Sequence, residues 1–109
     1  MEALETLDAI LSVLDPDEPF EVDGGNLPHL FGDPEWSLDD VHDVLASDPV
    51  FYVDNTDGPG EWLMVAEVSG GAVLVVPICR GSRFSQLRPI TVFEAGTQLA
   101  NRYRADRGG

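Results

Sequence analysis

The acidic and basic residues of this chain occupy separate parts of the sequence. Residues 1–61 contain seventeen acidic residues and neither lysine nor arginine, whereas residues 62–109 contain three acidic residues and all six arginines. Two interpretations are open. Either the carboxylates cover surfaces that face the solvent, or they contact a basic surface, which is the chain's own arginines or another protein. Because a screened surface ion pair contributes only about 0–1 kcal/mol, the acidic part also needs buried apolar side chains to fold onto the rest.

Length and composition narrow the class of protein. With 109 residues, of which 43% are apolar, the chain is long enough for one small globular domain. A net charge of −14 opposes contact with a nucleic acid backbone. A single cysteine excludes an internal disulfide framework, and no apolar run is long enough to cross a membrane. We therefore expect a cytoplasmic protein that needs no metal and no cofactor.

Residues 2–14 have the pattern of an amphipathic helix. Leucines recur at helical spacing, and acidic residues occupy the other face. Asp15-Pro16 ends the helix, because the residue before a proline avoids helical backbone angles. The leucines need burial, so this helix either packs on the rest of the chain or docks into another protein. A Gly- and Pro-rich stretch follows, and we expect residues 1–25 to form an acidic helix and linker ahead of a domain at residues 26–109.

Signals for a second helix and a small sheet follow. Ser37 and Asp40 have the spacing of a helix cap ahead of an apolar face. The strand candidates are residues 50–54, 62–68, 72–79 and 87–93. Ser69-Gly70-Gly71 predicts a hairpin, and Pro77 predicts that its strand ends at an edge or a bulge. With a closing helix at residues 94–105, the order α-α-β-β-β-β-α predicts an α+β fold with an antiparallel sheet of about four strands.

Several short segments carry a resemblance to a known family. They are Asn26-Leu27-Pro28-His29, Trp62-Leu63-Met64-Val65, Val73-Leu74-Val75-Val76, and Arg88-Pro89-Ile90-Thr91-Val92-Phe93-Glu94-Ala95 followed by Arg102-Tyr103. With this pattern, residues 26–103 resemble the BrnT-type toxins of bacterial toxin–antitoxin pairs. The resemblance implies a compact RelE-like fold, endoribonuclease activity and neutralisation by an antitoxin. Phe93 departs from the pattern, because the family has a second arginine there.

RNA cleavage in such a fold needs cations that stabilise the phosphorane and groups that move a proton. The resulting catalytic candidates are Arg88, Arg102, Tyr103 and His29, and the candidates for contact with RNA or a partner are Arg80, Arg83 and Arg104. Arg88 and Arg102 are the two that we expect to converge. In the alternative interpretation the arginines are surface charges, and Arg88 is an ion-pair partner for the acidic part of the chain.

Two further residue groups are interpreted as structural. Asp39, His42 and Asp43 share one helix surface, but this spacing is a weak indication of a metal site, and His42 is interpreted as a surface residue. Cys79 is expected to be a small buried apolar side chain rather than a nucleophile.

Functions from three different classes are open. The first is a BrnT-type endoribonuclease that acts on RNA and is neutralised by an antitoxin. The second is a catalytically inert acidic protein-binding module, a nucleic-acid mimic or an inhibitor of a basic partner, whose affinity falls steeply as salt rises. The third is a self-associating domain in which exposed Trp36, Phe51 or Tyr52 and the leucines of residues 2–14 form the interface. None of the three involves a membrane.

Overall fold

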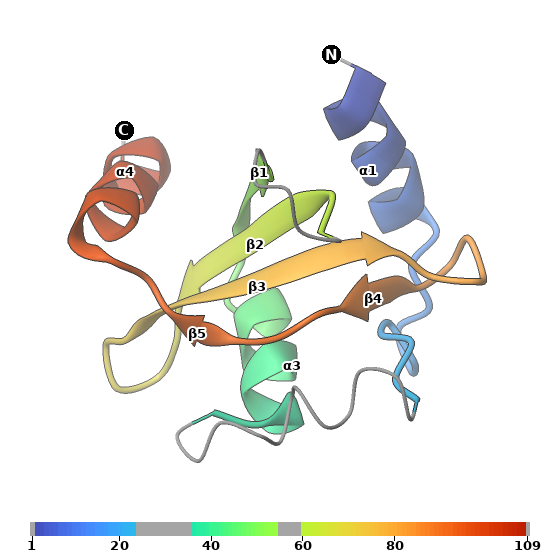
Figure 1. Ribbon diagram of the computed structural model, residues 1–109, viewed down its shortest axis with the longest axis horizontal. Coiled ribbons are helices and arrows are strands. Elements are labelled where there is room, and N and C mark those ends of the chain that lie inside the picture. Colours follow the sequence, from blue (N-terminus) through green and yellow to red (C-terminus); the bar gives the residue numbers. More distant parts are fainter. Residues whose placement is uncertain (1, 24–35, 55–59, 109) are drawn as a thin grey trace.

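An antiparallel sheet with helices on both faces forms the centre of the structure (Figure 1). The computed structural model describes residues 2–23, 36–54 and 60–108. Its elements are α1 (Glu2–Ser12), α3 (Leu38–Ala46), β1 (Val50–Val53), β2 (Trp62–Glu67), β3 (Val73–Arg80), β4 (Leu87–Pro89), β5 (Phe93–Glu94) and α4 (Thr97–Gly108). The predicted α+β class with a small antiparallel sheet is therefore confirmed.

The strands are neighbours in space in the order in which they occur in the sequence. The sheet order is β1-β2-β3-β4, and β5 pairs with β3 further along the edge that β4 occupies. The turn between β2 and β3 is the predicted hairpin, in which the Gly71 N–H donates to the Val68 carbonyl at 3.0 Å. Gly70 and Gly71 have φ angles of 99° and 91°, which residues with a side chain rarely adopt. The turn therefore requires its two glycines.

Pro77 lies inside β3 and accounts for a break in the neighbouring strand. The sequence predicts an edge or a bulge at Pro77 and a single strand over residues 87–93. Instead β3 is a central strand, and β4 and β5 are two short strands that pair with it on either side of Pro77. The Pro77 carbonyl accepts a hydrogen bond from the Ile90 N–H at 2.8 Å, so its backbone faces these two strands. Because proline has no N–H to donate, the ladder is interrupted there.

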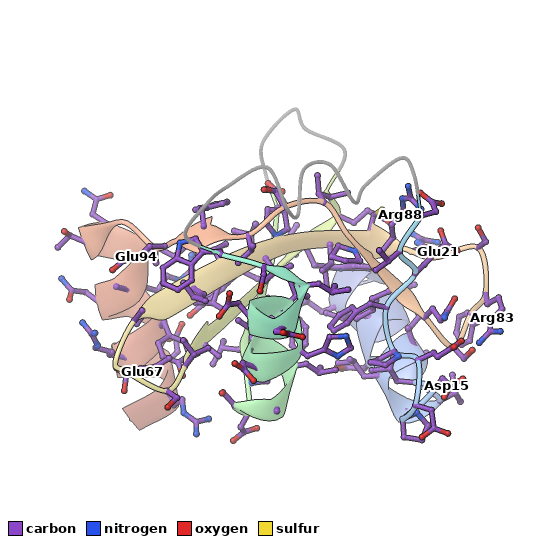
Figure 2. The ribbon with its side chains drawn as sticks, turned by 90° about the horizontal axis from the view of Figure 1, so that it is seen from below. Asp15, Glu21, Glu67, Arg83, Arg88 and Glu94 are labelled. Atoms are coloured by element: carbon purple, nitrogen blue, oxygen red, sulfur yellow. The ribbon has the colours of Figure 1, made fainter. Side chains whose placement is uncertain are left out.

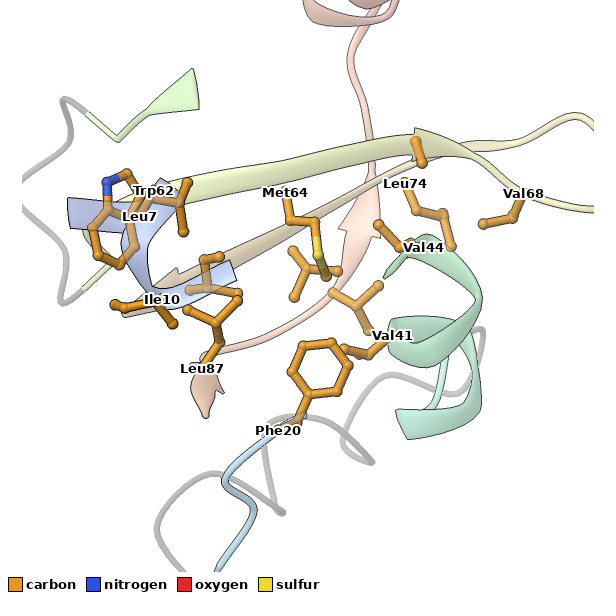
Figure 3. Packing of buried hydrophobic residues seen from close by; sticks show 14 residues of the cluster. Leu7, Ile10, Phe20, Val41, Val44, Trp62, Met64, Val68, Leu74 and Leu87 are labelled. Carbon is orange, nitrogen blue, oxygen red and sulfur yellow. The ribbon is translucent and has the colours of Figure 1, made fainter. Parts of the chain in front are cut away.

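One face of the sheet is covered by α1 and α3. Side chains alternate between the two faces along a strand, and those on this face are Trp62, Met64, Ala66, Leu74, Val76 and Ile78. Leu7 and Ile10 of α1 are buried among them (Figure 3). Val41 and Val44 of α3 fill the other half of the same cluster. The N-terminal helix therefore packs on the chain's own core, at about 1.5–3 kcal/mol for each large apolar side chain that it buries.

The opposite face carries a second, smaller apolar cluster. Ala100 and Tyr103 of α4 are buried against Val65 and Val75 of the central strands, together with Tyr52 of β1. The two clusters therefore lie on opposite sides of one sheet. None of the helices in the described ranges combines the length and the apolar character that a bilayer crossing needs.

Residues 15–23, called the acidic strap below, run along the outer edge of β4. The Leu87 N–H donates to the Pro19 carbonyl at 2.9 Å, and the Glu21 N–H donates to the Leu87 carbonyl at 2.8 Å. Phe20 forms a parallel bridge with Leu87, and its ring enters the core beside α3. The strap thus adds a short piece to the sheet and brings the acidic residues that follow Phe20 next to β4.

The second helix begins where its cap pattern predicts. Ser37 donates to Asp40 Oδ2 twice, from its backbone N–H at 2.8 Å and from its hydroxyl at 3.2 Å. A short side chain ahead of a helix and an acid three residues later satisfy each other in this way. The side chains of Asp39 and Asp40 also favour the positive end of the helix dipole.

Candidate functional site

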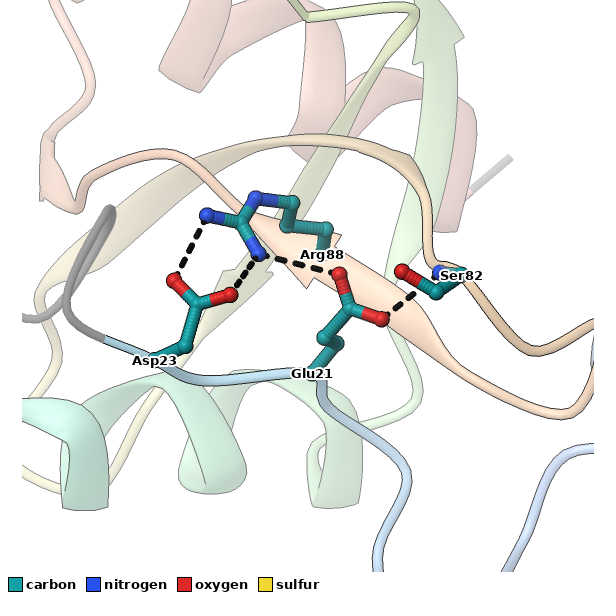
Figure 4. A network of polar contacts seen from close by, with 4 residues as sticks. All are labelled: Glu21, Asp23, Ser82 and Arg88. Carbon is teal, nitrogen blue, oxygen red and sulfur yellow. Dashed lines mark hydrogen bonds and ion pairs between the residues drawn. The ribbon is translucent and has the colours of Figure 1, made fainter.

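Arg88 of β4 lies at the centre of a polar network (Figure 4). Its Nη1 atom donates to Glu21 Oε1 at 2.9 Å and to Asp23 Oδ2 at 2.8 Å, and its Nη2 atom donates to Asp23 Oδ1 at 2.8 Å. The other carboxylate oxygen of Glu21 accepts the backbone N–H of Ser82 at 2.6 Å. One guanidinium therefore binds one carboxylate with two hydrogen bonds and shares a second carboxylate with the loop after β3.

The acidic strap positions this network. Phe20 and Leu87 point into the core, so their neighbours Glu21 and Arg88 point to the other side of the sheet. The side chains of Arg88 and Glu21 are only 23% and 18% exposed. Hydrogen bonds to Asp23 and then Glu21 raise the pKa of Arg88, while hydrogen bonds from Ser82 and then Arg88 lower the pKa of Glu21. The pair is therefore fully charged at neutral pH.

Arg80 and Arg83 also pair with acids from the first part of the chain. Arg80 Nε lies 3.1 Å from Glu61 Oε1, and the Arg80 backbone N–H donates to Glu61 Oε2 at 3.0 Å. The Arg80 guanidinium lies 6.0 Å from the centre of the Trp62 ring. Arg83 Nη2 lies 3.3 Å from Asp15 Oδ2, at the same end of the molecule as the Arg88 network (Figure 2). Both arginine side chains are more than half exposed, so these pairs neutralise charge at the surface.

Two arginines of α4 form ion pairs with carboxylates at the end of β2 and in the turn after α3. Arg104 Nη2 lies 3.5 Å from Glu67 Oε1 at the end of β2. Arg107 Nη1 lies 2.7 Å from Asp48 Oδ2 and donates to the Asp48 carbonyl at 2.8 Å. Asp48 has a φ of 56°, a left-handed conformation that is common just after a helix. These contacts tie the end of α4 to the turn between α3 and β1.

Arg102 of α4 forms a separate cluster with Tyr52 and Asp106. Its guanidinium lies 4.4 Å from the centre of the Tyr52 ring, and its Nε atom lies 3.7 Å from Asp106 Oδ2. The Tyr52 hydroxyl donates to Asp106 Oδ2 at 2.6 Å. Burial, followed by the hydrogen bond and the charge of Asp106, raises the pKa of Tyr52 to about 12. Tyr52 is therefore a neutral hydrogen-bond donor at physiological pH.

Arg88 and Arg102 are not brought together. Arg102 covers Tyr52 of β1, whereas Arg88 belongs to β4, and β2 and β3 lie between those two strands. At the usual strand spacing, β1 and β4 are about 14 Å apart. Each of the two arginines therefore belongs to a separate cluster.

Tyr103, Arg104 and Arg107 line an open hollow at the C-terminal end of α4. Its volume is about 290 Å³, and its lining residues are Ser47, Glu67, Tyr103, Arg104, Arg107 and Gly108. The Tyr103 ring is buried, and its hydroxyl accepts the backbone N–H of Glu67 at 3.2 Å. The hollow thus combines two guanidinium groups and one carboxylate around a tyrosine.

Of the residues that line this hollow, Tyr103 and Arg104 are candidates from the sequence, whereas Arg107 and Glu67 are not. Arg107 follows Tyr103 by four residues, so the helical spacing alone places both on one face of α4. Glu67 comes from a strand 36 residues before Tyr103 in the sequence, and no local pattern indicates that contact.

The remaining candidates have structural surroundings. His29 lies outside the described residues. His42 makes an edge-to-face contact with Phe20 at 5.0 Å between ring centres. Cys79 is half-buried, and burial followed by the charge of Glu61 raises the pKa of its thiol, which disfavours the reactive thiolate. Among the residues that the structure describes, no group of three or more His, Cys, Asp or Glu side chains is placed to hold a metal ion.

The aromatic residues expected at a self-association surface are not exposed. Tyr52 is buried, and Trp36 and Phe51 are half-buried against the main apolar cluster. The expected exposure is wrong, because the pattern of the sequence does not reveal that these three rings pack against the two apolar clusters of the same chain.

No family model, curated protein or solved structure matches this chain.

The arrangement leaves an excess of carboxylates at the surface. All six arginines have a carboxylate of the same chain within ion-pair distance. Exposed acids of the described residues that have no arginine within ion-pair distance include Asp8, Asp17, Glu18, Asp39, Asp43 and Glu94. Chemically, this surface suits cations and disfavours polyanions.

Proposed function

We propose that the protein is a catalytically inert, acidic protein-binding module that recognises a partner with a cationic surface. The observation that carries this proposal is the pairing of every arginine with a carboxylate of the same chain. A polyanion has to displace those carboxylates before it reaches a guanidinium. A cationic partner instead meets carboxylates that no arginine neutralises.

The charge of the whole chain acts in the same direction. At −14 it attracts a basic protein over a distance of about one Debye length and repels RNA and DNA over the same distance. Contacts of this kind raise association rates and weaken as salt screens them. The module therefore competes with nucleic acid for a basic surface, as a mimic or an inhibitor does.

A capture experiment with a charge variant tests the proposal. The full chain is immobilised, host proteins are captured at low salt, and the affinity of each captured protein is measured by calorimetry at two salt concentrations. The variant Asp8→Asn/Asp39→Asn/Asp43→Asn removes three exposed carboxylates, and Gln98→Ala/Asn101→Ala removes two exposed polar groups at constant charge. We expect the charge variant to bind a basic partner at least about tenfold more weakly at low salt, and the control to bind normally. A partner that binds the charge variant and the control equally well would refute the proposal. A partner whose affinity for the unaltered chain is the same at low salt and at about 0.5 M salt would also refute it.

A second candidate function is that of a BrnT-type endoribonuclease with a RelE-like fold, neutralised by an antitoxin. The resemblance of residues 88–95 and 102–103 supports it, as does the hollow that Tyr103 and Arg104 line with Arg107. In this candidate the two guanidinium groups stabilise the charge of the phosphorane, and the tyrosine hydroxyl moves a proton. Binding of RNA there has to compete with Glu67 for Arg104.

Growth and RNA integrity after induced expression separate the two candidates. The variants are Tyr103→Phe and Arg104→Gln in the hollow, Arg88→Ala in β4, and Gln98→Ala/Asn101→Ala as an exposed control. Growth arrest with RNA loss that Tyr103→Phe and Arg104→Gln abolish, and that Gln98→Ala/Asn101→Ala preserves, would establish the ribonuclease. Normal growth and intact RNA with all of the variants support the binding module.

A further inference from the structure

Phe84, in the loop between β3 and β4, has an unusual degree of exposure. Its side chain is 59% exposed, the largest value for a large apolar side chain among the described residues. Aromatic side chains are enriched at protein interfaces, where they act as anchors. An exposed aromatic ring that is held in a fixed position is therefore a candidate anchor for a partner.

The loop that carries Phe84 is held on both sides of the ring. Ser85 accepts the backbone N–H of Asp15 at 2.9 Å, and Arg83 pairs with the side chain of the same Asp15. Gln86 donates from its backbone N–H to the Arg83 carbonyl at 3.1 Å and from its side chain to the Glu18 carbonyl at 3.0 Å. The ring is therefore presented by a fixed loop, which lowers the entropy cost of binding through it.

The outer face of α1 forms a hollow with this ring. The hollow has a volume of about 470 Å³, and its lining residues are Glu5, Thr6, Ala9 and Phe84. Val13, which directly follows the last residue of α1, is 51% exposed. The inner face of the same helix is buried through Leu7 and Ile10, so its outer apolar side chains are not needed for the core.

The charge around the hollow indicates what it binds. Helix α1 contains three acidic residues and no basic one. Asp8 is exposed on α1 next to Ala9, and Arg83, the neighbour of Phe84, is already paired with Asp15. The hollow is apolar and the helix beside it is acidic. This surface is therefore complementary to an apolar side chain that is flanked by lysines or arginines.

Resting on the proposed function, we infer that the hollow between α1 and Phe84 is the docking site for a protein segment with one large apolar side chain between basic residues. The apolar side chain enters the hollow against Phe84 and Ala9, and its basic neighbours lie beside the acidic residues of α1. The apolar contact supplies affinity that salt does not screen, whereas the charges supply steering.

Synthetic peptides test the site on the full chain. The probe is a peptide of about twelve residues with a central tryptophan flanked by lysines and arginines. Its control has alanine in place of the tryptophan. Backbone chemical shifts of the protein are followed during the titration. We expect shifts confined to residues 5–13 and 82–86, and binding at least about tenfold weaker for the alanine peptide.

Protein variants complete the test. Phe84→Ala removes the anchor. Ala9→Lys fills the hollow with a long side chain whose positive charge repels the basic peptide. The control, Phe93→Ala, removes a phenylalanine that is 42% exposed elsewhere on the surface. The first two are expected to weaken tryptophan-peptide binding at least about tenfold, while Phe93→Ala binds as the unaltered chain does. Unchanged binding by Phe84→Ala, or shifts at another surface, overturns the docking site and leaves the proposed function standing. Absence of any peptide binding also overturns the site, and the proposed function fails only if the capture experiment finds no salt-sensitive basic partner.

Discussion

At the scale of single residues, Arg88 connects the two oppositely charged parts of the chain. It belongs to the arginine-containing part, while Glu21 and Asp23 belong to the acidic part. Because Arg88 and Glu21 are mostly removed from solvent, water replaces a lost partner poorly there. The arginine that the family resemblance makes a catalytic candidate therefore has a structural role.

Replacement of Arg88 by alanine is expected to destabilise the fold. The Arg88→Ala variant removes one guanidinium donor from the carboxylates of Glu21 and Asp23. We expect this to cost about 1–2 kcal/mol of unfolding free energy, and the exposure of Asp23 keeps the value low. Urea denaturation measures it. The control is Arg83→Ala, which removes an ion pair in which the arginine is more than half exposed, and we expect a clearly smaller loss. Equal losses in the two variants would contradict a structural role specific to Arg88.

The Glu21 carboxylate makes part of the stability dependent on pH. Its pKa is lowered in the folded chain from an ordinary value of 4.5. The stabilisation it provides is thus complete above pH 4.5 and is lost as the pH falls through the folded-state pKa. We expect Glu21→Gln to be less stable than the unaltered chain at pH 7, and the difference to shrink below pH 4.5. Unfolding free energies measured across this range test it, with Glu94→Gln as the exposed control. A difference that is constant with pH would contradict the assignment.

At the scale of helices and strands, local signals were sufficient where neighbouring residues decide the structure. The Ser37 cap and the hairpin at Gly70-Gly71 follow from backbone chemistry within a few residues, and both are confirmed. Pro77 is different, because its effect depends on which strand lies opposite the missing N–H. The strap along β4 and the contact between Glu67 and Arg104 join distant parts of the chain. No short pattern contains that information.

The hairpin glycine is expected to be sensitive to any side chain. Gly71 has a φ of 91° and nothing within 4 Å of an added Cβ, so its requirement is conformational and not steric. We expect Gly71→Ala to cost about 1–2 kcal/mol of unfolding free energy. Gly108→Ala, at the end of α4, also meets open space and has no positive φ, so it should leave thermal stability unchanged. Equal stability of the two variants would show that the turn tolerates a side chain.

Helix α1 is expected to be part of the cooperative fold. Leu7 is 1% exposed in the core, so Leu7→Ala leaves a cavity and should cost about 2–5 kcal/mol. The control is Val13→Ala, at an exposed position just after the helix, which should leave the unfolding free energy nearly unchanged. Chemical denaturation followed by tryptophan fluorescence measures both. A stable Leu7→Ala variant would mean that the helix is an appendage to the sheet.

At the scale of the whole molecule, folding pairs each arginine with a carboxylate, and the remaining carboxylates leave the surface with an excess of negative charge. The acidic first part runs from α1 through the strap along the β4 edge, and five of its carboxylates pair with arginines of β3, β4, the loop between them and α4. The segregation of charge along the sequence thus becomes internal pairing in the fold. What remains at the surface is negative, and the hollow between α1 and Phe84 adds an apolar anchor to it.

The most direct test of the proposed function is a titration of RNA with the purified full chain. Anisotropy of a labelled single-stranded RNA is measured at low salt, where any electrostatic binding is strongest, and the same samples are then examined on a gel. We expect no binding and intact RNA, because each guanidinium is already paired with a carboxylate. Saturable binding with cleavage that Tyr103→Phe or Arg104→Gln abolishes would contradict the binding module and establish a ribonuclease.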